Sequence, residues 1–405
     1  MKFIHNSFGT KFVYISVYSD AKLSSELGLG FSPAGTKKKK ELLEVIGALG
    51  SVSVLSVTAG FRGVKKIGGY YAGTIQVGSK SIAIERMPWM RLPPLAIFIN
   101  QIPIIYKLIR HRLLGARYIV LYNTIPEVFV PAIVAKSLMG FKIILQLEDG
   151  PNPNANVVRR SVESTFFRMA IKYSDGIVSN STSFGLSNND TPTMTFRGNF
   201  NKYSKAINYP RFNRDRFKIV MAGSLDAVRG LRLLVKLLES TQSYQIINNC
   251  DFVISGPSKS QFRQELSDAI STYRSRGGSA EFRGLLDREE LESEYKSADI
   301  FLSLQDPSHA FSKASFPSKI MEYAGYRRPI VSTAVSDLMN VDLFQGIVFC
   351  EYNQRALEAA ILSVMDGYRG FVIDAEKIST RLEASSSLNA NKINFSRLIK
   401  RIEAL

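Results

Sequence analysis

Two short segments place basic side chains beside turns of small residues. In the first, residues 221–231, Gly223 and Ser224 end an expected strand and Arg229 precedes an expected helix. Glycine lets the backbone approach a ligand closely, a helix start offers free N–H groups to phosphate, and arginine binds phosphate through two hydrogen bonds. Similar turns occur throughout α/β proteins, so this segment alone is a weak indication of a phosphate site.

The second segment, residues 315–332, is more specific. Pro317 suits a first helical turn, so Ser318 and Lys319 are expected at the positive end of a helix, where a lysine is unfavourable. An anionic diphosphate would account for this lysine, and Glu322, one turn later, could hold ribose hydroxyls. The alternative is an ordinary amphipathic helix with a solvated pair between Lys319 and Glu322.

Two adjacent acids, Glu148 and Asp149, follow an expected strand at 142–147. Sheets of parallel strands bind ligands at the carboxyl ends of those strands. Either acid could orient or deprotonate a substrate hydroxyl; we favour Asp149, with Glu148 as the alternative. The other interpretation is that the two acids cap the turn before Pro151.

Short apolar strands alternate with amphipathic helices along both halves of the chain. The expected strands are 12–18, 52–57, 118–122, 142–147, 176–179, 217–222, 251–255, 280–284, 299–304 and 329–333. The expected helices are 39–49, 102–114, 127–139, 158–173, 231–238, 261–273, 288–296 and 318–326. Near-continuous apolar strands separated by helices predict parallel sheets covered on both faces.

We therefore expect an α/β protein with two Rossmann-like, doubly wound domains that face each other across a cleft. The expected boundaries are a first domain at 1–200, a polar linker at 201–216, a second domain at 217–380 and a helical tail at 381–405 that could pack back on the first domain.

The composition excludes several classes of protein. With 405 residues, 45% of them hydrophobic and 21% charged, the chain is neither disordered nor collagenous. Its two cysteines are too few for a disulfide framework and lack the spacing of a zinc site, which favours a reducing compartment. No signal peptide is recognisable, and the most apolar segment, 93–105, is too short to span a bilayer. We expect a cytoplasmic protein.

The net charge of +17 is confined to the amino-terminal half. Residues 1–216 hold 29 basic and 12 acidic side chains, and the remaining 23 basic and 23 acidic side chains balance. A field of this kind attracts polyanions or an anionic bilayer. The run Lys37–Lys40 is either a solvated helix face or part of a lipid-binding surface, together with residues 88–98, Lys107, Arg110, Arg112 and Arg117. No nucleic-acid-binding signature is present, so we expect no nucleic-acid partner.

Together the motifs resemble the GT-B nucleotide-sugar glycosyltransferases and, within them, the retaining family 4. The matching segments are 222–231, 251–256, 282–285, 297–302, 316–323 and 328–332, with looser similarity at 32–37 and 174–180. The resemblance implies that Arg229 and Lys319, beside Ser318, compensate the donor diphosphate in place of a metal. It thus implies no metal and no cofactor beyond the nucleoside diphosphate sugar itself.

The resemblance also implies positions for the rest of the donor. Glu322 would bind the ribose, Gly256 and the segment from Arg283 to Leu285 would border the base, and Gly35 would let the first strand–helix loop approach the phosphates.

The sequence departs from the family pattern at two places. Ala314 stands where the family often has a second glutamate, for which Asp306 and His309 are candidate substitutes, and Glu148 and Asp149 stand where it often has a histidine.

These patterns predict a retaining glycosyltransferase that moves a sugar from a nucleoside diphosphate sugar to a glycan or lipid-linked acceptor. We expect a role in surface polysaccharide biosynthesis (lipopolysaccharide, capsule or exopolysaccharide), with peripheral association at the inner face of the cytoplasmic membrane. The alternatives are a sugar-nucleotide 2-epimerase and a non-catalytic protein that binds a glycan or polyanion.

Overall fold

The computed structural model describes residues 12–19, 24, 33–57, 67–90, 99–151, 156–182, 184, 190–200, 216–309, 312, 316–339 and 341–405. Ala314, segment 91–98 and all of the expected linker except Arg216 lie outside these residues. The chain divides into two compact units, the first comprising Met1–Asn199 and Leu388–Leu405 and the second Phe200–Ser387.

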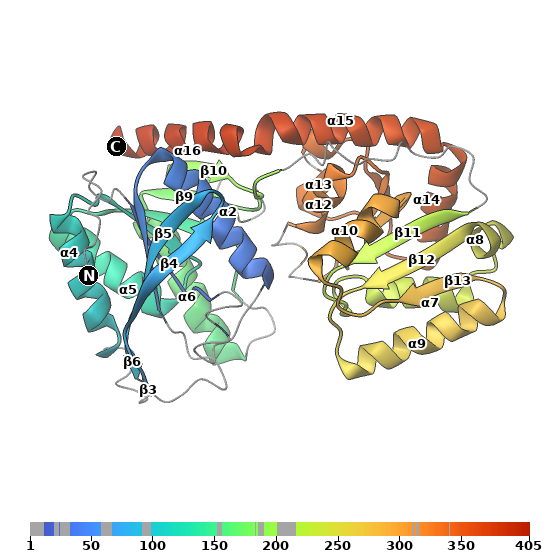
Figure 1. Ribbon diagram of the computed structural model, residues 1–405, viewed down its shortest axis with the longest axis horizontal. Coiled ribbons are helices and arrows are strands. Elements are labelled where there is room, and N and C mark those ends of the chain that lie inside the picture. Colours follow the sequence, from blue (N-terminus) through green and yellow to red (C-terminus); the bar gives the residue numbers. More distant parts are fainter. Residues whose placement is uncertain are drawn as a thin grey trace. The chain divides into compact units, whose positions relative to one another are not determined.

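An eight-stranded sheet organises the first unit (Figure 1). Its strands are β1 (Phe12–Ser16), β2 (Val52–Ser56), β4 (Tyr71–Val77), β5 (Lys80–Arg86), β7 (Tyr118–Tyr122), β8 (Lys142–Leu147), β9 (Gly176–Ser179) and β10 (Thr193–Thr195). They lie in the order β10-β9-β8-β7-β1-β2-β5-β4, and all neighbours run parallel except β4 and β5. The strand order therefore changes direction at β1, between β7 and β2, where such sheets bind ligands.

Helices cover both faces of this sheet. They are α2 (Pro33–Leu49), α4 (Gln101–Leu113), α5 (Pro126–Met139), α6 (Val157–Tyr173) and α16 (Leu388–Glu403). Helices α2 and α16 share one core with the sheet, in which Leu42, Ile46, Phe395 and Ile402 are fully buried, while α4, α5 and α6 contribute to a core on the opposite face. A short antiparallel pair, β3 (Ile67–Gly68) and β6 (Trp89–Met90), completes the unit.

Two features of the first unit differ from expectation. The antiparallel hairpin of β4 and β5 was not predicted, because its strands alternate buried with exposed residues and lack the nearly continuous apolar runs of the parallel strands. Helix α2 begins at Pro33 rather than at Lys39, so the lysine run lies inside the helix. Successive helical residues point in different directions, and the structure accordingly buries Lys39 and leaves Lys37 exposed.

The second unit has a fully parallel sheet of six strands. The strands are β11 (Phe217–Ala222), β12 (Cys250–Ser255), β13 (Ser279–Phe282), β14 (Ile300–Ser303), β15 (Ile330–Thr333) and β16 (Val348–Cys350). Their order is β13-β12-β11-β14-β15-β16, the doubly wound order of a Rossmann sheet, which changes direction between β11 and β14. The predicted α/β class and doubly wound topology are confirmed.

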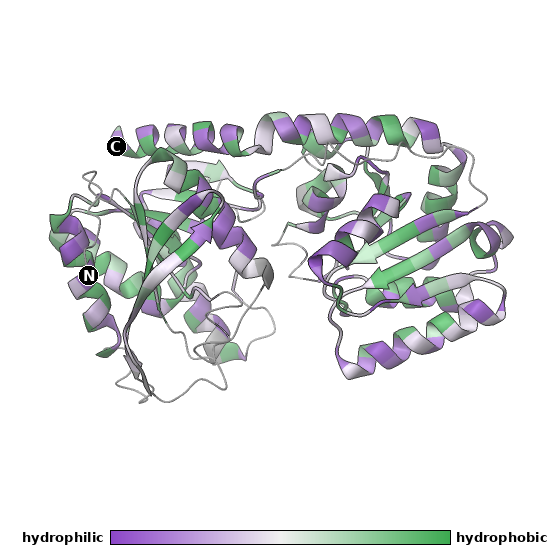
Figure 2. Cartoon of the chain, in the orientation of Figure 1, coloured by the Kyte–Doolittle hydropathy of each residue, from purple (hydrophilic) through white to green (hydrophobic). Residues whose placement is uncertain are grey.

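The helices of the second unit also form two layers. They are α7 (Leu231–Ser240), α8 (Tyr244–Asn249), α9 (Ser260–Ser275), α10 (Arg288–Ser297), α12 (Lys319–Gly325), α13 (Ser336–Met339), α14 (Gln354–Asp366) and α15 (Tyr368–Ser386), with a 3₁₀ turn at Asp342–Phe344. Helices α7, α8, α9 and α14 line one core, and α10, α12 and α15 line the other. Strands β11 and β12 are mostly apolar in Figure 2, as a sheet covered on both faces requires.

Candidate active site

Glycines shape the carboxyl end of β11. Gly223 and Gly256 have φ angles of 143° and 138°, which side chains rarely allow. The Gly223 N–H donates to the Ser255 carbonyl at 3.0 Å, and the Gly256 N–H donates to the Gly284 carbonyl at 2.7 Å. A Cβ atom at Gly256 would lie 1.7 Å from the Gly223 carbonyl oxygen. The ends of β11, β12 and β13 are thus joined closely by backbone alone.

Ser224 and Arg229 lie in the turn that leads from β11 to α7. The Arg229 N–H donates to Asp226 Oδ1 at 2.9 Å, and its guanidinium Nε lies 3.7 Å from Asp226 Oδ2. Gly230 has a φ of 87° and closes the turn against β14, since a Cβ there would lie 1.5 Å from the Leu304 carbonyl oxygen. The half-exposed Arg229 side chain therefore extends from a backbone that is fixed at both ends.

Helix α12 brings the second predicted segment to the first. The Lys319 side chain packs over Gly223, where a Cβ would lie 3.7 Å from Lys319 Cε. Tyr323 fastens the helix to β11, because its hydroxyl donates to the Ala222 carbonyl at 3.0 Å and accepts from the Ala222 N–H at 2.9 Å. The two segments, nearly a hundred residues apart in sequence, meet at the carboxyl end of β11.

Lys319 and Glu322 form an ion pair at 2.6 Å, as in the alternative interpretation of this segment as an ordinary amphipathic helix. The two side chains are, however, only 30% and 23% exposed. Lys319 Nζ also donates a hydrogen bond to the Tyr295 hydroxyl at 3.1 Å. Ser318 precedes the helix and is exposed, without a capping hydrogen bond from its side chain. The pair is therefore more enclosed than a solvated surface pair.

The residues expected near the base and the donor sugar are placed as follows. Leu285 follows β13 and is 78% exposed, while Arg283 is paired with Glu294 at 3.0 Å. Asp306 lies beside the Arg229 turn, since its N–H donates to the Val228 carbonyl at 2.8 Å. The His309 N–H in turn donates to the Asp306 carbonyl at 3.2 Å.

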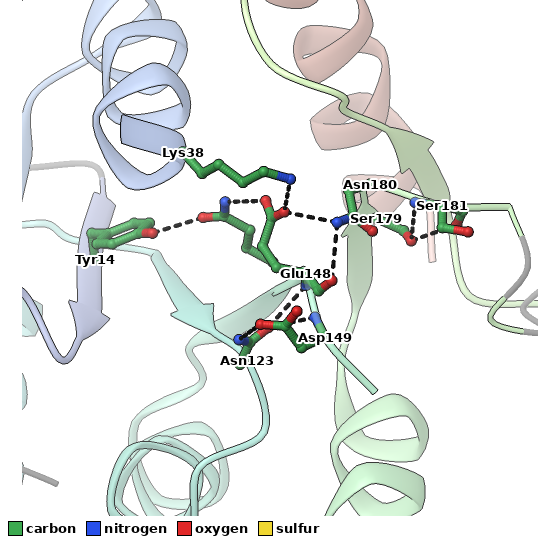
Figure 3. A network of polar contacts seen from close by, with 9 residues as sticks. Tyr14, Lys38, Asn123, Glu148, Asp149, Ser179, Asn180 and Ser181 are labelled. Atoms are coloured by element: carbon green, nitrogen blue, oxygen red, sulfur yellow. Dashed lines mark hydrogen bonds and ion pairs between the residues drawn. The ribbon is translucent and has the colours of Figure 1, made fainter. Parts of the chain in front are cut away.

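In the first unit, Glu148 is the centre of a buried polar network at the end of β8 (Figure 3). Its side chain is 4% exposed. Oε1 accepts from Gln146 Nε2 at 2.9 Å, and Oε2 accepts from Lys38 Nζ at 2.6 Å and from Asn180 Nδ2 at 2.9 Å. The hydroxyl of the fully buried Tyr14 donates to Gln146 Oε1 at 2.7 Å. Three donors from different elements thus satisfy the carboxylate.

Asp149 differs from its neighbour because it is exposed. Its carboxylate accepts from Asn123 Nδ2 at 3.3 Å, and Asn123 Oδ1 accepts the N–H groups of Glu148 at 2.8 Å and of Asp149 at 3.3 Å. Asn123 itself has a φ of 57°, a left-handed conformation that asparagine tolerates better than most residues.

Helix α2 contributes two lysines to this edge of the sheet. Lys39 Nζ donates to the Val17 carbonyl at 2.5 Å and lies 4.5 Å from the centre of the Tyr122 ring. Burial, partly offset by the negative charge of Glu148, lowers the pKa of Lys39 to about 8. Gly35 lies half buried in the first turn of the same helix.

Four further residues that were not predicted from sequence belong to these sites: Lys38, Asn123, Asn180 and Tyr295. An asparagine directly after a buried strand was the available signal for Asn123, because this residue type favours left-handed turns. Lys38 and Tyr295 had no such signal, since their partners are remote in sequence. Among the described residues, no group of three or more His, Cys, Asp or Glu side chains could hold a metal ion.

Comparison with solved structures identifies the fold class. Sucrose-phosphate synthase from Thermosynechococcus elongatus superposes with a TM-score of 0.67 at 13% identity, covering 98% of this chain and 99% of that one. HepE from Anabaena, in complex with UDP, gives 0.68 at 11% identity, covering 96% and 100%. A glycosyltransferase from Rickettsia africae gives 0.66 at 14% identity, covering 98% and 99%. The fold is GT-B over nearly the full length.

The family follows from the second unit. Residues 216–367 match the family model described as Glycosyl transferases group 1, a range that contains the β11 turn and α12. The second unit therefore matches the glycosyltransferases of group 1, within a chain that has the GT-B fold. A comparison with curated protein sequences finds no match.

Proposed function

We propose that this protein is a retaining glycosyltransferase that transfers a sugar from a nucleoside diphosphate sugar to a glycan or lipid-linked acceptor in surface polysaccharide biosynthesis. The observation that carries the donor assignment is the packing of Lys319 over Gly223, in the turn that also holds Arg229. Two cations and a side-chain-free backbone then meet at one sheet edge, which suits a diphosphate. The structures of HepE with UDP are consistent with this assignment.

Each predicted residue has a part in this proposal. Arg229 and Lys319, with Ser318 and Ser224 beside them, bind the diphosphate, and Glu322 binds the ribose once the donor phosphate competes for Lys319. Gly256 and Leu285 border the base, and Gly35 lets the start of α2 approach the phosphates. During transfer the acceptor oxygen bonds to the anomeric carbon, the bond from that carbon to the diphosphate breaks, and the hydroxyl proton passes to the Asp149 carboxylate.

Thermal unfolding tests the donor site directly. We expect one of UDP, GDP, ADP, dTDP and CMP to stabilise the protein without metal, by about 2.7 kcal/mol at 100 times its Kd. The variants Lys319→Ala and Glu322→Ala should lose this shift. Lys377→Ala is the matched control, because Lys377 forms the same i,i+3 pair with Asp374 on the exposed face of α15. A shift that survives in both site variants, or no shift with any nucleotide, would contradict the donor assignment.

A membrane-proximal acceptor is supported by helix α4. Its apolar residues Ile102, Tyr106, Ile109 and Leu113 form an exposed stripe, with Ile102 66% and Leu113 82% exposed. This stripe is the outer face of the helix, while Ile104, Leu108 and His111 are buried. Exposed apolar residues beside basic ones are typical of surfaces that bind anionic lipid.

The basic residues expected to bind lipid divide into two groups. Arg110 and Arg117 are exposed beside the stripe. Lys38 is paired with Glu148, Lys107 with Glu85, and Arg112 donates to the carbonyls of Met139 and Ala116. No helix in the described part of the chain is long and apolar enough to cross a membrane. We propose peripheral association with an anionic bilayer through the exposed group.

Vesicle co-sedimentation tests this association. At low salt we expect the protein to bind vesicles that contain phosphatidylglycerol and not vesicles of phosphatidylcholine alone. The double variant Ile109→Ser/Leu113→Ser should lose most of the binding, whereas Ile373→Ser, a change of an equally exposed residue on α15, should not. Equal binding by the α4 variant and the control would rule out α4 as the contact.

A further inference from the structure

The adjacent acids Glu148 and Asp149 have different surroundings, although both follow β8. Glu148 is enclosed, and its two carboxylate oxygens already accept from Gln146, Lys38 and Asn180. Its backbone carbonyl also accepts from Asn180 Nδ2 at 2.9 Å. A carboxylate held in this way cannot turn toward a substrate without leaving Lys38 unpaired, which is costly for a buried pair.

Asp149 is exposed, and Asn123 Nδ2 is its side-chain donor among the described residues. This donor binds Oδ2 and leaves Oδ1 for a further hydrogen bond. Asn123 is therefore in a position to fix the direction of the Asp149 carboxylate while one of its oxygens stays accessible (Figure 3).

Asn123 also fixes the backbone of both acids. Its Oδ1 accepts the two successive N–H groups, and its own N–H donates to the Gln146 carbonyl at 2.8 Å. Asn123 makes these contacts in a left-handed conformation, which asparagine adopts more readily than most residues other than glycine. A residue that contacts three backbone groups and one carboxylate of a candidate site suggests a positioning role.

We infer that Asn123 is a positioning residue that holds the Asp149 carboxylate for the acceptor hydroxyl, while Glu148, paired with Lys38, anchors the end of β8. The inference rests on the proposed function and deepens it, because it assigns separate roles to the two acids. Asp149 Oδ1 accepts the hydrogen bond of the acceptor hydroxyl and thereby orients the acceptor oxygen. Asn123 acts only through Asp149.

The first experiment needs no substrate. The carboxyl carbon of Asp149, labelled with ¹³C and assigned by its loss in Asp149→Asn, is titrated by NMR. In Asn123→Asp a second carboxylate replaces the amide 3.3 Å away, so we expect the titration midpoint to rise by about one pH unit. Asn123→Gly, which keeps the backbone conformation and removes the donor, should shift the Asp149 carboxyl resonance, because the hydrogen bond from Asn123 Nδ2 is lost. Asn353→Asp, at the exposed start of α14, is the control and should do neither.

Other titratable groups lie at this end of β8 and could affect the titration. They are Glu148, Lys38, Lys39 and Tyr122, and all of them are unchanged in the Asn123 variants. An unchanged midpoint in Asn123→Asp together with an unchanged Asp149 resonance in Asn123→Gly would overturn the inference.

The second experiment measures transfer, with the sugar conjugate of the nucleotide that stabilises the protein as donor and octyl glucoside as acceptor. We expect Asn123→Gly and Asp149→Asn to lower kcat at least tenfold and to keep the nucleotide-induced stabilisation, because neither residue belongs to the donor site. Asn123→Gly with wild-type kcat, or with its nucleotide binding lost as well, would contradict a positioning role. If the wild-type protein binds nucleotide but transfers nothing, the proposed function fails, and the NMR titration still decides the role of Asn123.

Discussion

At the ends of β11 and β12 the chain turns through Gly223 and Gly256, and backbone groups lie where side chains would otherwise be. At the end of β8 the same kind of sheet edge is filled by charged and polar side chains around Glu148. The second unit thus presents a backbone without side chains and two cations, Arg229 and Lys319, which suits a ligand with a constant part such as a diphosphate. The first unit presents a network of specific side chains, which suits an acceptor whose recognition depends on particular hydroxyls.

Adding one methyl group at Gly256 should disrupt the close backbone packing at the ends of β11 and β12. In Gly256→Ala the new Cβ would meet the Gly223 carbonyl oxygen at 1.7 Å, and the φ of 138° disfavours any side chain. We expect the second unit to lose about 3 kcal/mol or more of stability and the nucleotide-induced shift to disappear. Urea unfolding and nucleotide titration measure both.

Gly277→Ala separates conformational strain from the clash. Gly277 has a φ of 87° with open space around it, so its substitution should cost only about 1 kcal/mol and leave nucleotide binding intact. Equal losses in the two variants would show that the close packing of Gly256 on Gly223 is unimportant.

The polar network at the end of β8 should instead make the stability of the protein depend on pH. Burial lowers the pKa of Lys39 to about 8 in the folded protein, whereas its pKa is 10.5 in the unfolded chain. Between these two pH values the unfolded state therefore binds more protons. The burial of charged Lys39 therefore lowers the free energy of unfolding by its full amount below pH 8. This destabilisation decreases as the pH rises toward 10.5. Relative to Lys39→Met, the wild-type protein should gain on the order of 3 kcal/mol across this window, as measured by urea unfolding at several pH values.

Other groups of the network titrate at high pH as well. Burial raises the pKa of both Tyr14 and Tyr122. Their contributions cancel in the difference between the wild-type protein and Lys39→Met. If the difference in unfolding free energy between the two proteins stays constant with pH, burial does not lower the pKa of Lys39.

The parts of the fold that could be predicted from sequence are those with strong local periodicity. The strands of the two parallel sheets are nearly continuous apolar runs, and the α12 segment combines a proline, a lysine and a glutamate at informative spacings. Periodicity identified α4 as a helix but not its buried face, because the alternative faces are both partly apolar and one includes His111. Only packing against the sheet decides between them.

The side-chain network could not be predicted because its members are remote in sequence. Lys38 and Glu148 are 110 residues apart, and Tyr323 and Ala222 are 101 residues apart. No local pattern marks such pairs. The two acids after β8 were recognisable as a candidate site, but their different burial depends on the neighbouring elements α2 and β9.

The position of α16 has a consequence for synthesis on the ribosome. Phe395, Leu398 and Ile402 complete a core of the first unit, yet the whole second unit, Phe200–Ser387, precedes them in the chain. A nascent first unit therefore waits with part of its apolar surface uncovered while the second unit is made. The order of translation gives the second unit the chance to fold first, and it makes the first unit the part that depends on chaperones until the last helix emerges.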